Sequence, residues 1–168
     1  MAESKTKNMT DSILVLGEYR RVVDDRYRLS IPTEILDGLE LGNGDAVIAK
    51  ERPGCLSIWN RDKWNTRLHS NLQVIESKLK AKGIGDKPEN IQRLGRLLST
   101  RHRDIQIAAR GRIVVPEGFR EFLMAEAGSE VLVVGAAICV EIWTLDAWRE
   151  CLRDEIAGFN SLMDELAG

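Results

Sequence analysis

The sequence predicts a mixed β fold with helices (α+β), in which two related halves share one β-core about a pseudo-twofold axis. The first observation behind this prediction is an internal repeat, because a shift of 84 residues lays the chain on itself without a gap. Residues 26–64 then match residues 110–148 with 11 identities in 39 positions. Ordinary residue usage gives about two or three identities by chance. The second observation is the shared order of elements in each copy: strand, turn, strand, short helix, hairpin and longer helix.

Two copies favour a pseudo-twofold pair over a solenoid. One unit of this size leaves strand edges unpaired, and two units can interleave their strands around a common core. The identical residues are Arg26, Arg28, Pro32, Leu39, Gly44, Val47, Cys55, Ile58, Trp59, Asp62 and Trp64 in the first copy, and Arg110, Arg112, Pro116, Leu123, Gly128, Val131, Cys139, Ile142, Trp143, Asp146 and Trp148 in the second.

The first copy is predicted from alternation and turn residues. Residues 28–31 alternate with the period of a half-buried strand. Pro32 ends that strand, because proline has no N–H for the ladder but fits the first turn of a helix. Pro53-Gly54 supplies a hairpin turn, and Asn60 is a good N-cap. The elements expected here are strands over 13–23, 28–31, 46–50 and 55–59, a charged turn over 24–27, and a short helix to about Gly38.

Helices are predicted between the copies, and the first pattern then recurs. Gly83-Ile84-Gly85 breaks a long helix that ends near Lys82, and Asp86 with Glu89 opens a second helix through Leu98. Thr144 takes the capping place of Asn60. The elements expected in the second copy are strands over 103–109, 112–115, 131–134 and 139–143, a short helix after Pro116, and a C-terminal helix.

These elements divide the chain into five segments. They are a flexible N-terminal tail over 1–12, a first repeat over 13–66, a helical linker over 67–100, a second repeat over 101–150, and a C-terminal helix over 151–168.

Composition limits the compartment. Hydrophobic residues make up 43% and charged residues 30% of the chain, as in ordinary globular proteins. No apolar run approaches the about 20 residues of a membrane span, and the polar start lacks the layout of a signal peptide. We therefore expect a cytoplasmic protein with no membrane partner, in which Cys55 and Cys139 pack as small apolar side chains rather than as a disulfide.

The inventory of reactive residues argues against catalysis. His69 and His102 have no cysteine or carboxylate around them at metal-ligand spacing. No glycine-rich phosphate loop follows a strand, and no serine lies in a nucleophile elbow. Asp24 and Asp25 form a carboxylate pair, but the second copy has two alanines there, which favours a solvated turn. The sequence predicts no enzyme, no metal site and no cofactor.

Two Arg-x-Arg pairs stand out, each where a turn enters a strand. They are Arg26 with Arg28, and Arg110 with Arg112. Alternate residues of a strand face the same way, so each pair presents two guanidinium groups together. That arrangement suits phosphate or the paired acceptors of guanine. The alternative interpretation is that these arginines form ion pairs with acids such as Glu18, Glu34 or Glu117, or with neighbouring chains.

The distribution of charge and the positions of the tryptophans also bear on nucleic-acid binding. The net charge of −2 argues against a generic nucleic-acid binder, but residues 101–112 carry four arginines against one aspartate. Residues 141–168 carry seven acids against two bases. The four tryptophans could form a stacking platform for single strands. Because they occupy equivalent places in both copies, we expect them in the core instead.

The motifs resemble one family. Gly17-Glu18-Tyr19, Asp24 four residues before Arg28, and Leu29-Ser30-Ile31-Pro32 closely resemble the opening motif of the MraZ family. The run from Arg110 to Pro116, followed by Phe119-Arg120, resembles that family's second copy. The resemblance covers roughly residues 13–150.

The resemblance implies a swapped-hairpin β-barrel of the AbrB-like class with flanking helices. It also implies a bacterial transcriptional regulator of its own promoter and of the cell-division and cell-wall gene cluster. Such proteins are nucleoid-associated, ring-shaped homo-oligomers that bind double-stranded promoter DNA with repeated boxes. By position, the resemblance assigns DNA contact to Asp24, Arg26, Arg28, Arg110 and Arg112.

On this basis Arg26 and Arg28 are expected to contact phosphates and guanine edges, with Asp24 orienting Arg28 through a charge-assisted hydrogen bond. The chain departs from the family at Tyr27, where glycine is usual, and at Ala108, where an acid is usual. Tyr27 is expected to alter the first turn, and Ala108 to leave the second pair of arginines less rigid.

Two other functions stay open. An AbrB-like antitoxin would use residues 149–168 to neutralise a toxin, and a ring-forming scaffold would bind protein rather than DNA. The two apolar helical stripes bear on assembly: the first is expected to pack within the protomer, and the second either within it or between protomers. The stripes are Leu68, Leu72, Ile75 and Leu79, and then Trp148, Leu152, Ile156, Phe159, Met163 and Leu166.

Overall fold

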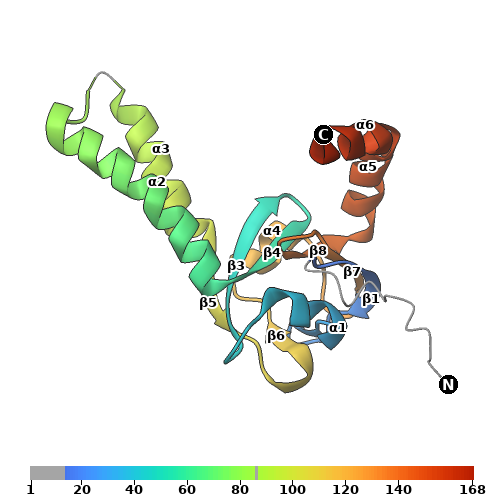
Figure 1. Ribbon diagram of the computed structural model, residues 1–168. Helices are drawn as coiled ribbons and strands as arrows, with labels where there is room; N and C mark the ends of the chain where they lie inside the picture. Colours follow the sequence, from blue (N-terminus) through green and yellow to red (C-terminus); the bar gives the residue numbers. More distant parts are fainter. Residues whose placement is uncertain (1–13, 86) are drawn as a thin grey trace.

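The computed structural model describes residues 14–85 and 87–168. Two sheets form the centre of the molecule, and two helical projections extend from opposite sides of them (Figure 1). The expected tail over 1–12 and the expected capping residue Asp86 lie outside the described residues.

Eight strands build the two sheets. The larger sheet has the order β1-β7-β8-β4-β3-β5, and the smaller one pairs β2 with β6; every pairing is antiparallel. The strands are β1 (Glu18–Val22), β2 (Arg28–Ser30), β3 (Asp45–Arg52), β4 (Cys55–Asn60), β5 (His102–Gln106), β6 (Arg112–Val114), β7 (Glu130–Gly135) and β8 (Val140–Thr144).

The 84-residue repeat is visible in the strand order. The shift carries β1 onto β5 and β2 onto β6, residue for residue. Across the two halves, β1 pairs with β7, β5 pairs with β3, and β4 pairs with β8. The order of the larger sheet therefore reads the same from either end, and the predicted mixture of strands and helices is confirmed.

Helices follow the hairpins and join the halves. Asn60 caps α2 by accepting a hydrogen bond from the backbone N–H of Lys63 at 3.1 Å. Thr144 caps α5 by accepting one from the backbone N–H of Ala147 at 3.4 Å. Both predicted caps are thus confirmed. The helices are α1 (Thr33–Leu36), α2 (Arg61–Lys82), α3 (Pro88–Thr100), α4 (Phe119–Leu123), α5 (Leu145–Glu155) and α6 (Phe159–Ala167), with 3-10 turns at Asp37–Leu39, Ala109–Gly111 and Ile156–Gly158.

Three predicted boundaries were wrong. The first strand begins at Glu18 rather than at residue 13, and before it Val15 forms a single bridge to Ala137. The strand expected over 103–109 ends at Gln106, because a 3-10 turn follows with its backbone in the left-handed region. The C-terminal helix is interrupted at Ile156–Gly158.

The core lies between the sheets and the short helices and draws on both halves. Its main cluster includes Ile31, Ile48 and Phe119 from the first and second copies together. Trp143 and Trp64 are buried as expected, the first beneath α5 and the second against β3. Cys55 and Cys139 are free and buried, which confirms their apolar packing.

Candidate nucleic-acid interface

The β2–β6 ribbon brings one arginine from each repeat to a common surface. Arg28 lies opposite Val114, Leu29 opposite Ile113, and Ser30 opposite Arg112. Leu29 and Ile113 are buried, while Arg28 and Arg112 are exposed. Because alternate residues of a strand point to opposite faces, the two guanidinium groups lie on the same outer face of the ribbon.

The Asp24 carboxylate organises the turn that enters β2. One of its oxygens accepts hydrogen bonds from the backbone N–H groups of Arg26 and Arg28, both at 2.9 Å. Its other oxygen accepts one from Nε of Arg28 at 2.8 Å. The backbone hydrogen bond from Arg28 is the largest cause that holds the pKa of Asp24 below its usual value. The carboxylate is therefore ionised at neutral pH and fixes the direction of the Arg28 side chain.

The turn that enters β6 keeps the closing backbone hydrogen bond but lacks the carboxylate. Ala108 N–H donates to the Arg112 carbonyl at 2.9 Å, as Asp24 N–H donates to the Arg28 carbonyl at 3.0 Å. Arg110 and Gly111 both adopt the left-handed region, with φ of 63° and 73°. Ala108 offers no acceptor to Arg112, so this second arginine is held by its strand alone.

Tyr27 takes the left-handed backbone of its counterpart Gly111, with φ of 56°. Its ring lies under the guanidinium of Arg120, whose Cζ is 4.4 Å from the ring centroid. The Tyr27 carbonyl accepts from Val115 N–H at 2.9 Å, and the Gly111 carbonyl accepts from Ile31 N–H at 2.8 Å. These backbone hydrogen bonds match in the two turns, but the backbone does not match throughout, because Arg110 is left-handed and its counterpart Arg26 is not.

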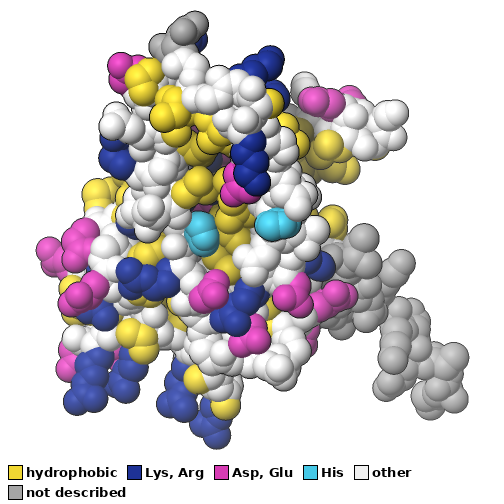
Figure 2. All heavy atoms as spheres, turned by 90° about the vertical axis from the view of Figure 1, so that its left-hand side faces the viewer, with side chains coloured by type: hydrophobic (Ala, Val, Ile, Leu, Met, Phe, Trp, Pro, Cys, Tyr) yellow, Lys and Arg dark blue, Asp and Glu magenta, His cyan; other side chains and the backbone are white. Residues whose placement is uncertain are grey.

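Two shallow depressions flank the paired arginines. One, of about 320 Å³, is lined by Arg21, Asp24 and Ser30 together with Arg28 and Arg112. The other, of about 420 Å³, shares Arg28 and Arg112 and is otherwise lined mainly by β5 and β6. Figure 2 shows Lys and Arg side chains gathered at the lower end of the molecule, the end that β6 and the segment before it form in Figure 1. Such a row of cations suits a phosphate backbone.

The structure brings Asp24, Arg28 and Arg112 together and places Arg26 and Arg110 in the turns just before the two strands. Among the residues that the structure describes, the side chains of Arg26, Arg110 and Arg112 have no ion-pair partner. The surface ion pairs with Glu18, Glu34 and Glu117, which were the alternative, do not occur within that part of the chain.

Arg21 is a basic residue of this surface that the motif missed. Its Nε donates to the Ser30 carbonyl at 3.2 Å, which ties β1 to β2. The available signal was the cluster of four arginines over residues 20–28. Its neighbour Arg20 instead pairs with Glu130 at 3.5 Å.

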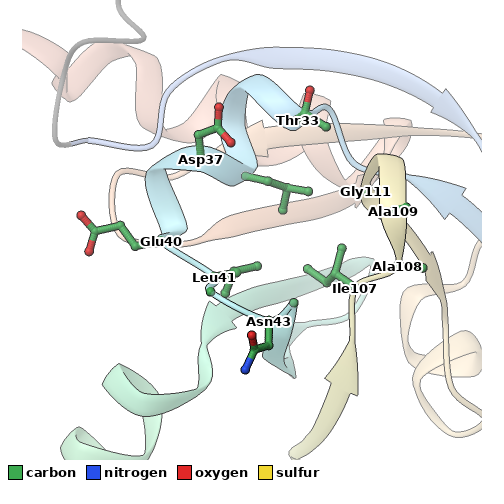
Figure 3. A pocket seen from close by; sticks show the side chains of 12 residues that line it. Thr33, Asp37, Glu40, Leu41, Asn43, Ile107, Ala108, Ala109 and Gly111 are labelled. Carbon is green, nitrogen blue, oxygen red and sulfur yellow. The ribbon is translucent and has the colours of Figure 1, made fainter.

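A further groove lies away from this surface (Figure 3). It holds about 590 Å³ between α1 with its following turn and residues 107–111. Leu41 and Ile107 point toward one another across it, and Asp37 and Glu40 stand at its rim. The carboxylates at this rim would repel phosphate, so the groove does not extend the cationic surface.

No helix in residues 14–85 or 87–168 combines the length and the apolar character needed to cross a bilayer. Over the same residues, no cluster of His, Cys, Asp or Glu side chains is arranged to hold a metal ion.

Comparison with known proteins gives one consistent result. A family described as "MraZ protein, putative antitoxin-like" matches residues 100–164. The transcriptional regulator MraZ of Roseiflexus sp. is 29% identical over 92% of this chain and 97% of its own length. The namesake proteins of Alkaliphilus oremlandii and Acetivibrio thermocellus are each 26% identical, over 92% and 90% of this chain and 97% and 95% of their own lengths.

Proposed function

Because this chain belongs to the MraZ family of transcriptional regulators, we propose that it binds double-stranded promoter DNA through the outer face of the β2–β6 ribbon. Its targets are repeated boxes upstream of its own gene, in the cluster for cell division and the cell wall. It works there as a nucleoid-associated ring of identical subunits.

The observation that carries this proposal is the paired arrangement of Arg28 and Arg112. Asp24 holds Arg28 with its guanidinium fixed, at 2.8 Å from Nε to carboxylate oxygen. The remaining N–H groups of Arg28 are then aimed outward and can donate to guanine acceptors or to a phosphate. Arg112 lines the same depressions as Arg28, and Arg26 and Arg110 lie in the turns before the two strands. These three arginines have no ion-pair partners among the described residues and supply further phosphate contacts.

The strand order supports a swapped-hairpin barrel for the two halves. Each half gives its outer strand, β1 or β5, to the hairpin of the other half. The β2–β6 pair joins the halves again at the DNA-facing end. With the smaller sheet closing over the larger one, the two repeats would form a single barrel that presents both arginine turns at one end.

Assembly compensates for the small size of the cationic surface. A protomer with net charge −2 and four such arginines neutralises few phosphates and binds DNA weakly by itself. A ring repeats the surface, and several protomers on spaced boxes gain from effective concentration.

The test is binding of the purified protein to the duplex upstream of its own gene, across a salt series and beside a scrambled duplex. We expect selective binding that weakens with salt, and Arg28→Ala is expected to reduce promoter affinity by at least about tenfold, since a good bidentate contact discriminates by about 1–3 kcal/mol.

Arg20→Ala is the matched control, because it removes the same charge from an exposed residue that pairs with Glu130. Equal affinity for promoter and scrambled duplexes would contradict the proposal. That result would favour the scaffold or the antitoxin, with the C-terminal segment as the binding surface for a protein partner.

A further inference from the structure

A small pocket lies at the base of α2, where this helix leaves the larger sheet (Figure 1). It holds about 220 Å³, whereas pockets for drug-sized ligands hold about 300–1,000 Å³, so it suits a smaller molecule. The first half contributes the start of α2 to its wall, and the second half contributes Ala137 and Ile138. None of the described residues that line it also lines the depressions beside Arg28 and Arg112.

The repeat gives this pocket an equivalent place in the second half, and the chain fills that place. The shift of 84 residues equates Ile138 with Gly54 and Gly38 with Phe122. The N–H of Gly54 donates directly to the carbonyl of Phe122 at 3.0 Å. A Cβ on Gly54 would lie only 2.7 Å from the Cβ of Ala147. The turn that carries Gly54 is therefore packed against its surroundings and leaves no space.

In the first half, Val15 makes the connection that a direct hydrogen bond makes in the second. Val15 and Ala137 exchange two backbone hydrogen bonds, at 2.8 and 2.9 Å. Val15 also lies against Gly38, where an added Cβ would be 2.9 Å from Cγ2 of Val15. The turn of residues 136–138 thus reaches Gly38 through Val15, and the pocket lies beside this link.

Two cations line the pocket where the repeat has small uncharged residues. The shift equates Lys63 with Ala147 and Arg67 with Cys151. Lys63 pairs with Glu40 at 3.6 Å, but Arg67 has no ion-pair partner among the residues that the structure describes. The described residues that line the pocket include no Asp or Glu. The pocket therefore favours an anion.

Two tryptophan rings line the same pocket. The ring centroids of Trp59 and Trp64 are 5.5 Å apart, and Cζ of Arg67 is 5.3 Å from the centroid of Trp59. The indole N–H of Trp59 donates to Oγ of Ser57 at 2.8 Å. The buried indole N–H of Trp64 has no hydrogen-bond partner in the described part of the chain. Because buried polar groups are nearly always hydrogen-bonded, this wall of the pocket lacks an acceptor that a bound molecule can bring.

We infer that this pocket binds a small aromatic carboxylate. The flat apolar body lies against Trp59, Trp64 and Ile138, as apolar walls hold most of a small ligand. The carboxylate lies at the mouth and accepts from Arg67, whose planar guanidinium matches that group. This site goes beyond the proposed function, since it requires neither DNA nor a second copy of the chain.

Equilibrium dialysis of the whole chain with naphthoate tests the site. We expect saturable binding of one molecule per chain, and much weaker binding of neutral naphthylmethanol, which has the same rings but no carboxylate. Inorganic phosphate should displace little naphthoate, because it has no apolar body. The inference is overturned if millimolar naphthoate shows no saturable binding, if the neutral compound binds equally well, or if equimolar phosphate displaces naphthoate fully.

Substitution of Arg67 tests the anion contact. Arg67→Ala should weaken naphthoate binding by about tenfold or more, since the lost hydrogen bonds join charged groups. Arg67→Lys should recover part of the affinity, because the charge returns without the planar fork. The matched control is Lys78→Ala, which removes the same charge from an exposed residue of α2 that does not line the pocket. Equal losses in Arg67→Ala and Lys78→Ala would mean that only net charge matters, and the site would be wrong.

Ile138→Asp tests the opposite wall. Ile138 is 56% exposed, so this substitution leaves the core intact. It places a carboxylate in the pocket, where it would repel the carboxylate of naphthoate and pair with the cations. We expect a loss of affinity at least as large as that of Arg67→Ala. Unchanged affinity in Ile138→Asp would show that naphthoate binds somewhere else.

Promoter binding is measured separately on the same variants. Arg67→Ala should keep the selectivity of the wild type for its promoter, because Arg67 lies outside the arginine surface of the β2–β6 ribbon. If the wild type selects its promoter but does not bind naphthoate, only this inference falls. If naphthoate binds and Arg67→Ala weakens it while the wild type does not select its promoter, the pocket stands and the DNA-binding proposal falls.

Discussion

Asp24 and Ala108 occupy equivalent places in the two arginine turns, which differ in the left-handed backbone of Arg110 and in the Asp24 carboxylate. At Asp24 it collects three hydrogen bonds from Arg26 and Arg28. At Ala108 only the backbone bonds to Gly111 and Arg112 are present. An arginine fixed in advance loses less freedom on binding than a free one. The first turn is therefore suited to selecting a base, and the second to neutralising phosphate.

This difference predicts opposite effects for two neighbouring aspartates. Asp25→Ala removes a negative charge from an exposed residue and should strengthen promoter and scrambled duplex binding alike. Asp24→Ala removes the same charge but frees Arg28, so the ratio of promoter to scrambled affinity should fall severalfold. Competition titrations with both duplexes measure this ratio. An unchanged ratio in Asp24→Ala would show that Arg28 needs no positioning.

Protonation of Asp24 at low pH should weaken its hold on Arg28, as Asp24→Ala does. The pKa of Asp24 is lowered on folding, so its contribution is fully present above the ordinary value of 3.8 and is lost as pH falls through the lower value. An NMR titration of the Asp24 carboxyl carbon should show that lowered midpoint in the wild type. Arg28→Ala keeps the backbone N–H, so the midpoint should rise only part of the way to the ordinary value, and the size of that rise identifies the side-chain share of the effect.

Gly111 is the position where the second turn tolerates no side chain. Its φ is 73°, and a Cβ there would overlap the carbonyl oxygen of Ile31. Gly111→Ala should lower the free energy of unfolding by about 3 kcal/mol, from left-handed strain plus overlap. Gly118→Ala is the control, because Gly118 has φ of 81° with open space around it, and it should lose about 1 kcal/mol. Urea unfolding of both variants checks the difference, and equal losses would contradict the overlap.

At the scale of elements, local sequence patterns predicted the strands and the helix caps. They did not predict where one strand ends or where the C-terminal helix is interrupted. Asn60 and Thr144 cap their helices as expected, because capping depends on one side chain and the next turn. The strand expected over 103–109 is cut short by left-handed residues that alternation does not reveal. The C-terminal stripe keeps its helical spacing through Gly158, so its pattern alone did not show the break at Ile156–Gly158.

The candidate site was predictable in its residues but not in its geometry. The repeat identified both Arg-x-Arg pairs, and the spacing of Asp24 and Arg28 anticipated their hydrogen bond. That Arg28 and Arg112 share one face follows from the pairing of β2 with β6, across 84 residues of chain. Arg21 joins them through its hydrogen bond to the Ser30 carbonyl, a contact that the cluster of arginines over residues 20–28 did not specify.

Glu141 on β8 of the larger sheet gives a prediction for how stability depends on pH. Burial is the main cause that raises the pKa of this carboxyl above 4.5, against a hydrogen bond of 3.2 Å from Nε1 of Trp143. The folded state thus keeps the proton to higher pH than the unfolded chain, so stability falls as pH rises from 4.5 through the raised pKa.

Glu141→Gln removes this ionisation and leaves an acceptor for Trp143. Its unfolding free energy should match the wild type near pH 4 and exceed it near pH 7, as measured by urea unfolding at both values. Glu117→Gln, at an exposed position, should show no such divergence. A variant equally destabilised at both pH values would indicate a structural role for the carboxylate instead.

For the whole molecule, the net negative charge and the local cluster of arginines have different effects on DNA binding. The net charge of −2 keeps one protomer from binding DNA indiscriminately. Under the proposed function, selective affinity depends on how many protomers reach the DNA together, and that number can be counted.

Salt dependence provides that count. Each neutralised phosphate contributes about −0.9 to the slope of log K against log salt, so removing one contact from every protomer changes the slope by about 0.9 times the number of protomers bound. Arg112→Ala, at an arginine without an ion-pair partner in the described chain, should therefore flatten the slope by several units on a duplex with several boxes and by about one on a duplex with a single box. Arg20→Ala, already paired with Glu130, should change neither slope. An equal change on both duplexes would mean that only one protomer touches DNA at a time, and effective concentration would then no longer explain how so small a cationic surface binds.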